Sequence, residues 1–220
     1  MPSYGHHTQQ KQTSSLGADL NNSDTKGYTM AGKLKLDLTG ETVAITGGGG
    51  ILCSVMAEAV ANAGANVAVL DIMEDAAGGV ADKINSNGGR AVAVKADVLD
   101  KNSLQEAYGR VVEQFGGVTI LINGAGGNKK EATTSAETSF FDLPSDAFQW
   151  VFNLNFIGTL LTTQVFARNM ADKGAGNIIN ISSMNAFRPL TKIAAYSAAK
   201  AAVSNFTQWL AVHMSQNYGA

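Results

Sequence analysis

Short apolar runs alternate with segments of helical spacing along most of this 220-residue chain. The runs are continuous rather than alternating between apolar and polar residues, which is typical of strands covered on both faces of their sheet. Strands separated by helices pair in parallel through right-handed crossovers. The pattern therefore predicts an α/β fold with a doubly wound parallel sheet. The predicted strands are residues 42–46, 66–71, 91–96, 118–123 and 177–181.

The segments between these strands have the spacing of helices, and glycines follow the first three, where helices commonly end. The predicted helices are residues 51–63, 74–87, 101–115, 146–173 and 194–216, with one or two short helices near 139–143. Together the elements predict one three-layer αβα domain of the Rossmann type over residues 32–220. Residues 1–31 are rich in Gln, Ser, Asn, Thr and Gly and lack periodicity, which indicates a polar N-terminal leader.

Charge and cysteine content exclude several classes of protein. The formal net charge is -2, without a long run of either sign, so neither nucleic acid nor a membrane surface is an expected partner. The single cysteine, Cys53, excludes an intrachain disulfide and fits a cytoplasmic protein, and we expect it to be a small core side chain. The pair His6 and His7 is more typical of a solvated tail than of a metal site, so no metal is expected.

Four consecutive glycines, Gly47 to Gly50, lie between the first predicted strand and the first predicted helix. Pyrophosphate binds at such places because the N–H groups of a helix start are free and side chains would block its approach. Asp71 ends the second strand about 25 residues downstream, where a carboxylate accepts the ribose hydroxyls of a dinucleotide. A carboxylate there repels a 2′-phosphate, and no Arg or Lys lies near either place along the sequence, which favours NAD over NADP. Asp71 could instead be a helix cap or a solvated turn residue.

Neighbouring loop residues complete the predicted dinucleotide site. Asp97 follows the third strand and could contact adenine, with Val98 packing on the ring. The residues that we predict to bind the cofactor in these loops are Gly47, Gly49, Gly50, Ile51, Leu52, Asp71, Ile72, Asp97 and Val98.

Tyr196 and Lys200 are spaced to share one face of the last predicted helix. The ordinary pKa of a tyrosine phenol is about 10, which is too high for a base at neutral pH. A nearby cation lowers this pKa because it favours the phenolate. Tyr196 could then exchange a proton with a substrate hydroxyl, while Lys200 could also hold the nicotinamide ribose. A Tyr and a Lys at this spacing are common on exposed helices. The prediction therefore depends on other candidate catalytic residues nearby in the fold.

Two polar residues support it. Ser183 follows the fifth strand, where a hydroxyl could donate a hydrogen bond to the substrate oxygen; Ser182 is the competing candidate. Asn155 lies within a long predicted helix, an unfavourable place for Asn. It is either a satisfied polar residue or an irregularity in the helix that holds a water for proton relay to Lys200.

These residues resemble the short-chain dehydrogenase/reductase superfamily in order and spacing, over roughly residues 36–216. The matching residues are Thr46 with its glycines, Asn123, Gly124, Ala125, Gly126, Asn155, Ser183, Tyr196 and Lys200. The resemblance implies an NAD-dependent oxidoreductase with a tetrad of Asn155, Ser183, Tyr196 and Lys200, and it adds 123–126, Tyr196 and Lys200 to the cofactor-binding set. Two motifs depart from the family pattern. Ile51, Leu52 and Cys53 replace Gly-Ile-Gly, and Gly124 replaces the second Asn of Asn-Asn-Ala-Gly.

Longer segments, among them TGGGGILCSVMA, VFNLNFIGTLL and INISSMNAFRPLT, resemble the D-mannonate oxidoreductases (fructuronate reductases), with gluconate 5-dehydrogenases as the nearest alternative. This implies a sugar-acid substrate, whose carboxylate and hydroxyls need a cation and amides. Arg188, Asn185 and Asn128 are the candidates, with Lys129 and Lys130, although loop charges of this kind are often solvated.

The family resemblance also implies a homo-oligomer, a tetramer or a dimer, paired through helices 146–173 and 194–216. Phe166, Phe206 and Trp209 are candidate interface residues, with core packing as the simpler interpretation. Family members continue past the last helix with further strands and a lid. We therefore expect this sequence to be part of a longer protein that carries the C-terminal strands. A catalytically inactive NAD-binding regulator is the alternative of another class, but Ser183, Tyr196 and Lys200 argue against it.

Overall fold

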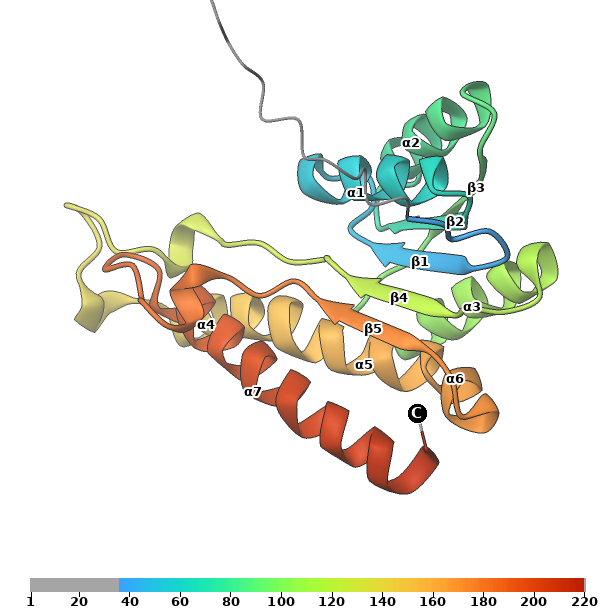
Figure 1. Ribbon diagram of the computed structural model, residues 1–220. Coiled ribbons are helices and arrows are strands. Elements are labelled where there is room, and N and C mark those ends of the chain that lie inside the picture. Colours follow the sequence, from blue (N-terminus) through green and yellow to red (C-terminus); the bar gives the residue numbers. More distant parts are fainter. Residues whose placement is uncertain (1–35, 220) are drawn as a thin grey trace, which may run out of the picture. The chain divides into compact units, whose positions relative to one another are not determined.

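The computed structural model describes residues 36–219, so the predicted leader lies outside the described residues. Five parallel strands form one sheet in the order β3-β2-β1-β4-β5 (Figure 1). Their bounds are β1 Thr42–Thr46, β2 Asn66–Asp71, β3 Arg90–Lys95, β4 Ile120–Asn123 and β5 Asn177–Asn180. The strand order reverses between β1 and β4, and open α/β sheets bind ligands at the carboxyl ends of the strands at such a point.

Helices cover both faces of the sheet, which confirms the doubly wound fold. α1 (Ile51–Asn62) and α2 (Glu74–Ser86) pack on one face, where they enclose the side chains of Val43 and Ile45. α3 (Lys101–Phe115) and α5 (Gly158–Phe166) pack on the other, against Ala44. Successive residues of β1 thus point into two different cores, which explains why the strand is apolar throughout.

The prediction of one continuous helix over residues 146–173 is wrong in detail. The chain forms α4 (Ser145–Phe152), a π-helical segment η3 (Asn153–Ile157), α5, and α6 (Arg168–Lys173). The irregularity that Asn155 predicted is therefore present. The amide of Asn155 bonds outside its own helix, to Gly127, and a π-bulge allows such a departure. α7 (Ala194–Tyr218) agrees closely with its prediction.

Loop segments and strand starts differ slightly from the prediction. Short helices lie at η1 (Lys130–Ala132), η2 (Phe140–Asp142) and η4 (Met184–Ala186). β4 begins at Ile120 rather than at residue 118. The backbone N–H of Thr42 donates to the hydroxyl of Thr119 at 2.9 Å, so a side chain replaces the carbonyl acceptor that the ladder would supply.

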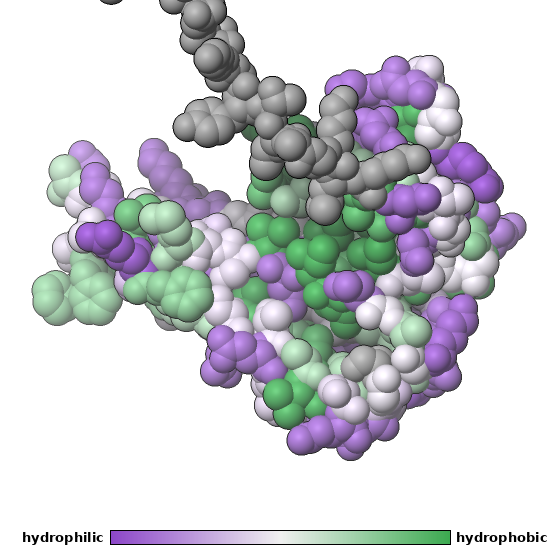
Figure 2. All heavy atoms as spheres, in the orientation of Figure 1, coloured by the Kyte–Doolittle hydropathy of each residue, from purple (hydrophilic) through white to green (hydrophobic). Residues whose placement is uncertain are grey.

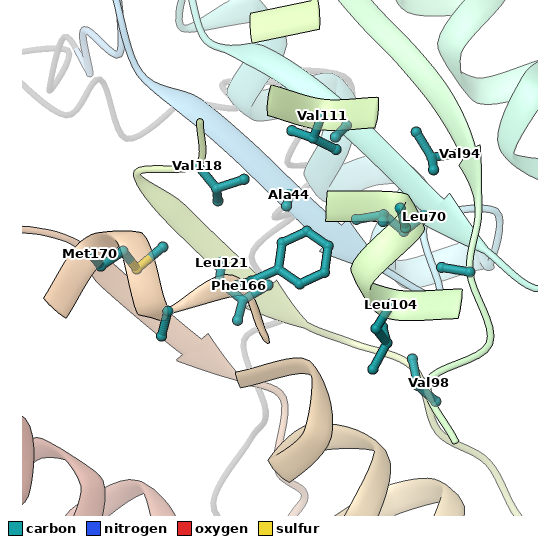
Figure 3. Packing of buried hydrophobic residues seen from close by; sticks show 14 residues of the cluster. Ala44, Leu70, Val94, Val98, Leu104, Val111, Val118, Leu121, Phe166 and Met170 are labelled. Atoms are coloured by element: carbon teal, nitrogen blue, oxygen red, sulfur yellow. The ribbon is translucent and has the colours of Figure 1, made fainter. Parts of the chain in front are cut away.

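The larger core cluster is organised around Phe166. Its ring lies among Ala44, Leu70 and Leu121 and makes an edge-to-face contact with Tyr108 at 5.4 Å (Figure 3). Phe141, by contrast, is 91% exposed on the segment that projects at the left in Figures 1 and 2.

We expect Phe166→Ala to lower the free energy of unfolding by about 3–5 kcal/mol, because it removes a buried ring and leaves a cavity. The matched control Phe141→Ala should change it by less than about 0.5 kcal/mol, since the ring is already solvated. Urea denaturation followed by circular dichroism measures both. Similar losses in the two variants would contradict the placement of Phe166 in the core.

Candidate active site

A cavity of about 390 Å³ lies at the carboxyl ends of β1, β2, β3 and β4. Its lining comes from the end of β2, the turns after these strands, the first turn of α1 and one residue of η3. The lining residues are Gly47, Gly50, Ile51, Leu52, Cys53, Asp71, Ile72, Ala96, Asp97, Val98, Gly124, Ala125, Gly126 and Leu154. Most of the predicted cofactor residues are among them. Gly49, Asn123, Tyr196 and Lys200 do not line this cavity, and Cys53, Ala96 and Leu154 were not predicted to.

The glycines after β1 differ in what they contact. A Cβ at Gly49 would lie 2.6 Å from Ala76 Cβ, so this glycine allows α2 to pack closely rather than opening the cavity. Gly47 has a φ of +64°, and its missing Cβ leaves room for the backbone of Ala125. Gly50 caps α1 without a side-chain hydrogen bond. The first turn of α1 therefore presents N–H groups at the cavity that no cap occupies.

Asp71 is held on the cavity wall by backbone donors. Its Oδ2 accepts from Gly49 N and its Oδ1 from Met73 N, each at 3.0 Å. The residue is thus a turn residue and a cavity carboxylate together. Lys95 is its register partner on β3 and is exposed. A cation therefore lies nearer to Asp71 than the sequence indicated, because strand register brings together residues far apart in the chain.

Asp97 and Asn123 have different surroundings. Asp97 Oδ1 accepts from Leu99 N at 2.9 Å, which holds the turn after β3 along the cavity. Asn123 is buried, and its Nδ2 donates to Thr163 Oγ1 and to Asn180 Oδ1. Its side chain links β4 to α5 and β5 and does not reach the cavity.

Lys200 and Tyr196 share one face of α7, as their spacing predicted. Lys200 Nζ lies 5.6 Å from the Tyr196 ring centroid and donates to Ile181 O at 2.7 Å. Lys200 is only 4% exposed, and burial lowers the pKa of its ammonium. Tyr196 packs against a small cluster that includes Ala132 and Val151.

Asn155 is fully buried and clamps Gly127. Its Oδ1 accepts from Gly127 N at 3.2 Å, and its Nδ2 donates to Gly127 O at 2.7 Å and to Val151 O at 2.8 Å. A Cβ at the preceding Gly126 would lie 3.4 Å from Lys200 Nζ and 2.5 Å from Asn155 Oδ1. The turn after β4, η3 and α7 therefore meet at Gly126.

The two adjacent serines after β5 have separate surroundings. Ser182 Oγ donates to Lys200 O at 3.1 Å and lies 2.6 Å from Ser204 Oγ, so it fastens the turn to α7. Ser183 Oγ accepts from Asn185 N at 3.2 Å and keeps its own proton for a further acceptor. The geometry favours Ser183 over Ser182 as a group that contacts substrate.

The predicted substrate residues lie on the two loops after β4 and β5. Asn128 Nδ2 donates to Thr133 Oγ1 at 2.8 Å, and Lys129 Nζ lies over the Trp150 ring at 5.5 Å. Asn185 is buried, whereas Arg188 is exposed. Arg188 and Lys192 are both exposed cations on the loop that carries Ser183.

The model of the short chain dehydrogenase family matches residues 41–218. The chain belongs to the short-chain dehydrogenase family. It is therefore a dehydrogenase or reductase. An uncharacterised oxidoreductase of Haemophilus influenzae is 50% identical over 199 residues, which are 86% of this chain and 70% of that protein. The uncharacterised oxidoreductase UxuB of Bacillus subtilis is 46% identical over 188 residues, covering 82% and 68%.

A solved structure is similar to this short-chain dehydrogenase over most of its length. It is a Haemophilus protein assigned provisionally as a D-mannonate oxidoreductase, crystallised with bound NAD. The identity is 50%, the TM-score is 0.78, and the match covers 82% of this chain and 68% of the other. Within residues 36–219, no helix is long and apolar enough to cross a bilayer, and no group of three or more His, Cys, Asp or Glu could hold a metal ion.

The lowered pKa of Lys200 predicts how the stability of this dehydrogenase depends on pH. In the unfolded chain Lys200 keeps its proton up to about its ordinary value of 10.5, whereas the folded protein releases it at lower pH. Between these two values the unfolded state binds more protons, so the free energy of unfolding rises with pH. Urea denaturation at several alkaline pH values should show wild type gaining stability relative to Lys200→Met. A difference independent of pH would contradict the lowered pKa.

Proposed function

We propose that this dehydrogenase uses NAD(H) to interconvert a hydroxyl and a ketone on a sugar acid, with D-mannonate and D-fructuronate as the favoured pair. The observation that carries the proposal is that Lys200 lies beside the Tyr196 ring and close to Gly126, which lines the cavity whose wall holds Asp71. Relatives support the two halves of the proposal. The similar Haemophilus protein binds NAD and is provisionally assigned to D-mannonate.

The residues that line the cavity suit a dinucleotide. The N-terminus of α1 has no side-chain cap, which leaves donors for a pyrophosphate. Asp71 would hold the adenosine ribose, and Val98 would pack on the adenine. The backbone at Gly126 approaches Lys200 so closely that a side chain would fill the space between them. When bound, the nicotinamide supplies hydride transfer.

We assign the proton transfer to Tyr196. Its phenol would give a proton to the carbonyl oxygen during reduction and take it back during oxidation. The Lys200 ammonium lies close to the ring in a buried place, where low dielectric strengthens its stabilisation of charge on the phenol oxygen. Ser183 would donate a hydrogen bond to the same substrate oxygen. Asn155 would hold the turn at Gly127 and a water on the path to Lys200.

The loops after β4 and β5 would select the sugar acid. Arg188 would bind the carboxylate with two parallel hydrogen bonds. Asn128 and Asn185 would contact hydroxyls, whereas Lys129 already lies over the Trp150 ring. We assign the carboxylate to Arg188 for this reason.

The decisive experiment compares wild type with Tyr196→Phe on mannonate, gluconate and their keto partners. Wild type should turn over the mannonate pair fastest and bind NADH more tightly than NADPH. Tyr196→Phe should lose about 10²-fold or more in kcat, because it cannot transfer the proton, but should keep its NADH affinity. Absorbance of NADH measures turnover, and fluorescence titration measures binding.

Tyr218→Phe is the matched control and should keep full activity, since Tyr218 lies at the far end of α7. Undiminished turnover by Tyr196→Phe would overturn the assignment of the proton to Tyr196. Tighter binding of NADPH would overturn the role of Asp71, and Lys95 would then be the first residue to examine.

We also propose that the protein assembles as a homo-oligomer through α7 and η3. Phe166 is core, as the simpler interpretation predicted, but Trp209 is 56% exposed. A row of rings continues across this surface, with centroids 5.9 Å apart for Phe156 and Phe206 and 6.1 Å apart for Phe206 and Trp209. Exposed aromatic surfaces of this kind mark interfaces, and a second copy presenting the same row would cover it.

Trp209→Glu should convert a dimer or tetramer into monomers, because it places a charge at the proposed contact. Light scattering after size exclusion measures the mass. Phe141→Glu is the matched control on a remote exposed ring and should leave the mass unchanged. A wild-type protein that is monomeric at high concentration would overturn this proposal.

A further inference from the structure

Cys53 and Gly124 occupy one space between α1 and the end of β4. Cys53 is 4% exposed, although it follows the exposed Ile51 and Leu52 in the first turn of α1. A Cβ built at Gly124 would overlap the Sγ of Cys53. Gly124 does not have a positive φ, so its backbone conformation does not require glycine. The thiol is therefore the largest obstacle to a side chain at position 124.

Two further contacts join the same loops. The hydroxyl of Thr46 accepts from Gly124 N at 3.1 Å and from Ala125 N at 3.2 Å. The backbones of Gly47 and Ala125 are so close that a Cβ at Gly47 would lie 2.9 Å from Ala125 Cα. Both loops line the cavity. A displacement of the Cys53 thiol would therefore move the start of α1, which lines the cavity.

We propose that Cys53 and Gly124 form a complementary pair that positions the N-terminus of α1 and thereby sets the affinity for the dinucleotide. The inference rests on the proposed use of NAD(H). It also joins the departures from the family pattern at positions 53 and 124 in one exchange. The side chain that the family carries at position 124 is absent, and the one that the family lacks at position 53 fills its place.

The surroundings of the thiol suit a packing group rather than a nucleophile. Burial and the carboxylate of Asp71 raise the pKa of Cys53, more than Lys200 lowers it. The side chain therefore stays uncharged at neutral pH, and an uncharged sulfur packs against a backbone without the cost of burying a charge.

A double-mutant cycle with Cys53→Ala and Gly124→Ala tests the pair. The Cβ of Cys53 would lie 3.7 Å from a new Cβ at position 124, which is an ordinary contact, so Cys53→Ala makes room for the second substitution. The added Cβ also lies 2.9 Å from Thr46 O in either background, and this contribution cancels in the cycle.

Gly124→Ala should weaken NADH binding about tenfold or more in the wild-type background and about threefold or less in the Cys53→Ala background. Fluorescence titration of NADH without substrate gives the affinity, and urea midpoints give the stability of each variant. In steady-state assays the KM for NADH should rise while kcat changes little, because the pair contacts neither the reacting atoms nor Tyr196.

Equal penalties in both backgrounds would overturn the pairing. A restored urea midpoint without restored NADH affinity would show a purely structural contact and would overturn the positioning role. If Gly124→Ala alone does not fold, recovery of folding and NADH binding in the double variant supports the pair, and failure to recover overturns it. Wild type that does not bind NADH would overturn the proposed function instead.

Discussion

The site depends on the contact between the turn after β1 and the turn after β4. Thr46 and Asn123 are register partners, so these two turns leave the sheet side by side. The hydroxyl of Thr46 accepts hydrogen bonds from two N–H groups of the neighbouring turn. Gly47 and Gly124 lie so close to atoms of the facing segments that a side chain at either position would clash. Because this contact fixes where α1 starts and where Gly126 lies, both the dinucleotide cavity and the surroundings of Lys200 follow from it.

Buried polar groups extend this arrangement to the residues to which we assign catalysis. The side-chain amide of Asn155 donates a hydrogen bond to Gly127 O, and the ammonium of Lys200 donates one to Ile181 O. A buried amide or ammonium without a partner destabilises the fold, so these bonds hold the loops after β4 and β5 onto η3 and α7. The same side chains to which we assign catalysis thus join the elements that carry them, and substitutions there affect stability and activity together.

The sequence predicted the sheet well because both faces of its strands are buried. β1 and β2 have the predicted bounds, since an apolar run that ends at a glycine or a carboxylate marks a strand without further information. The break in the helix around Asn155 was predicted only as an irregularity. Its π-helical form depends on the partner Gly127, which is distant in the chain. The proximity of Lys95 to Asp71 was missed for a similar reason, because register is a property of paired strands.

The glycine run shows why a motif cannot assign roles to its own residues. Gly48 and Gly49 are small because Val69 and Ala76 approach them, with distances of 2.6 Å from each missing Cβ. Gly47 is required by its positive φ and by the close approach of Ala125. Of the four, only Gly50 has little around it besides the Gly47 carbonyl. Side chains at Gly48 or Gly49 would therefore act first on packing, whereas one at Gly50 would act first on the cavity. Four identical residues thus separate into folding and binding only when their neighbours are known.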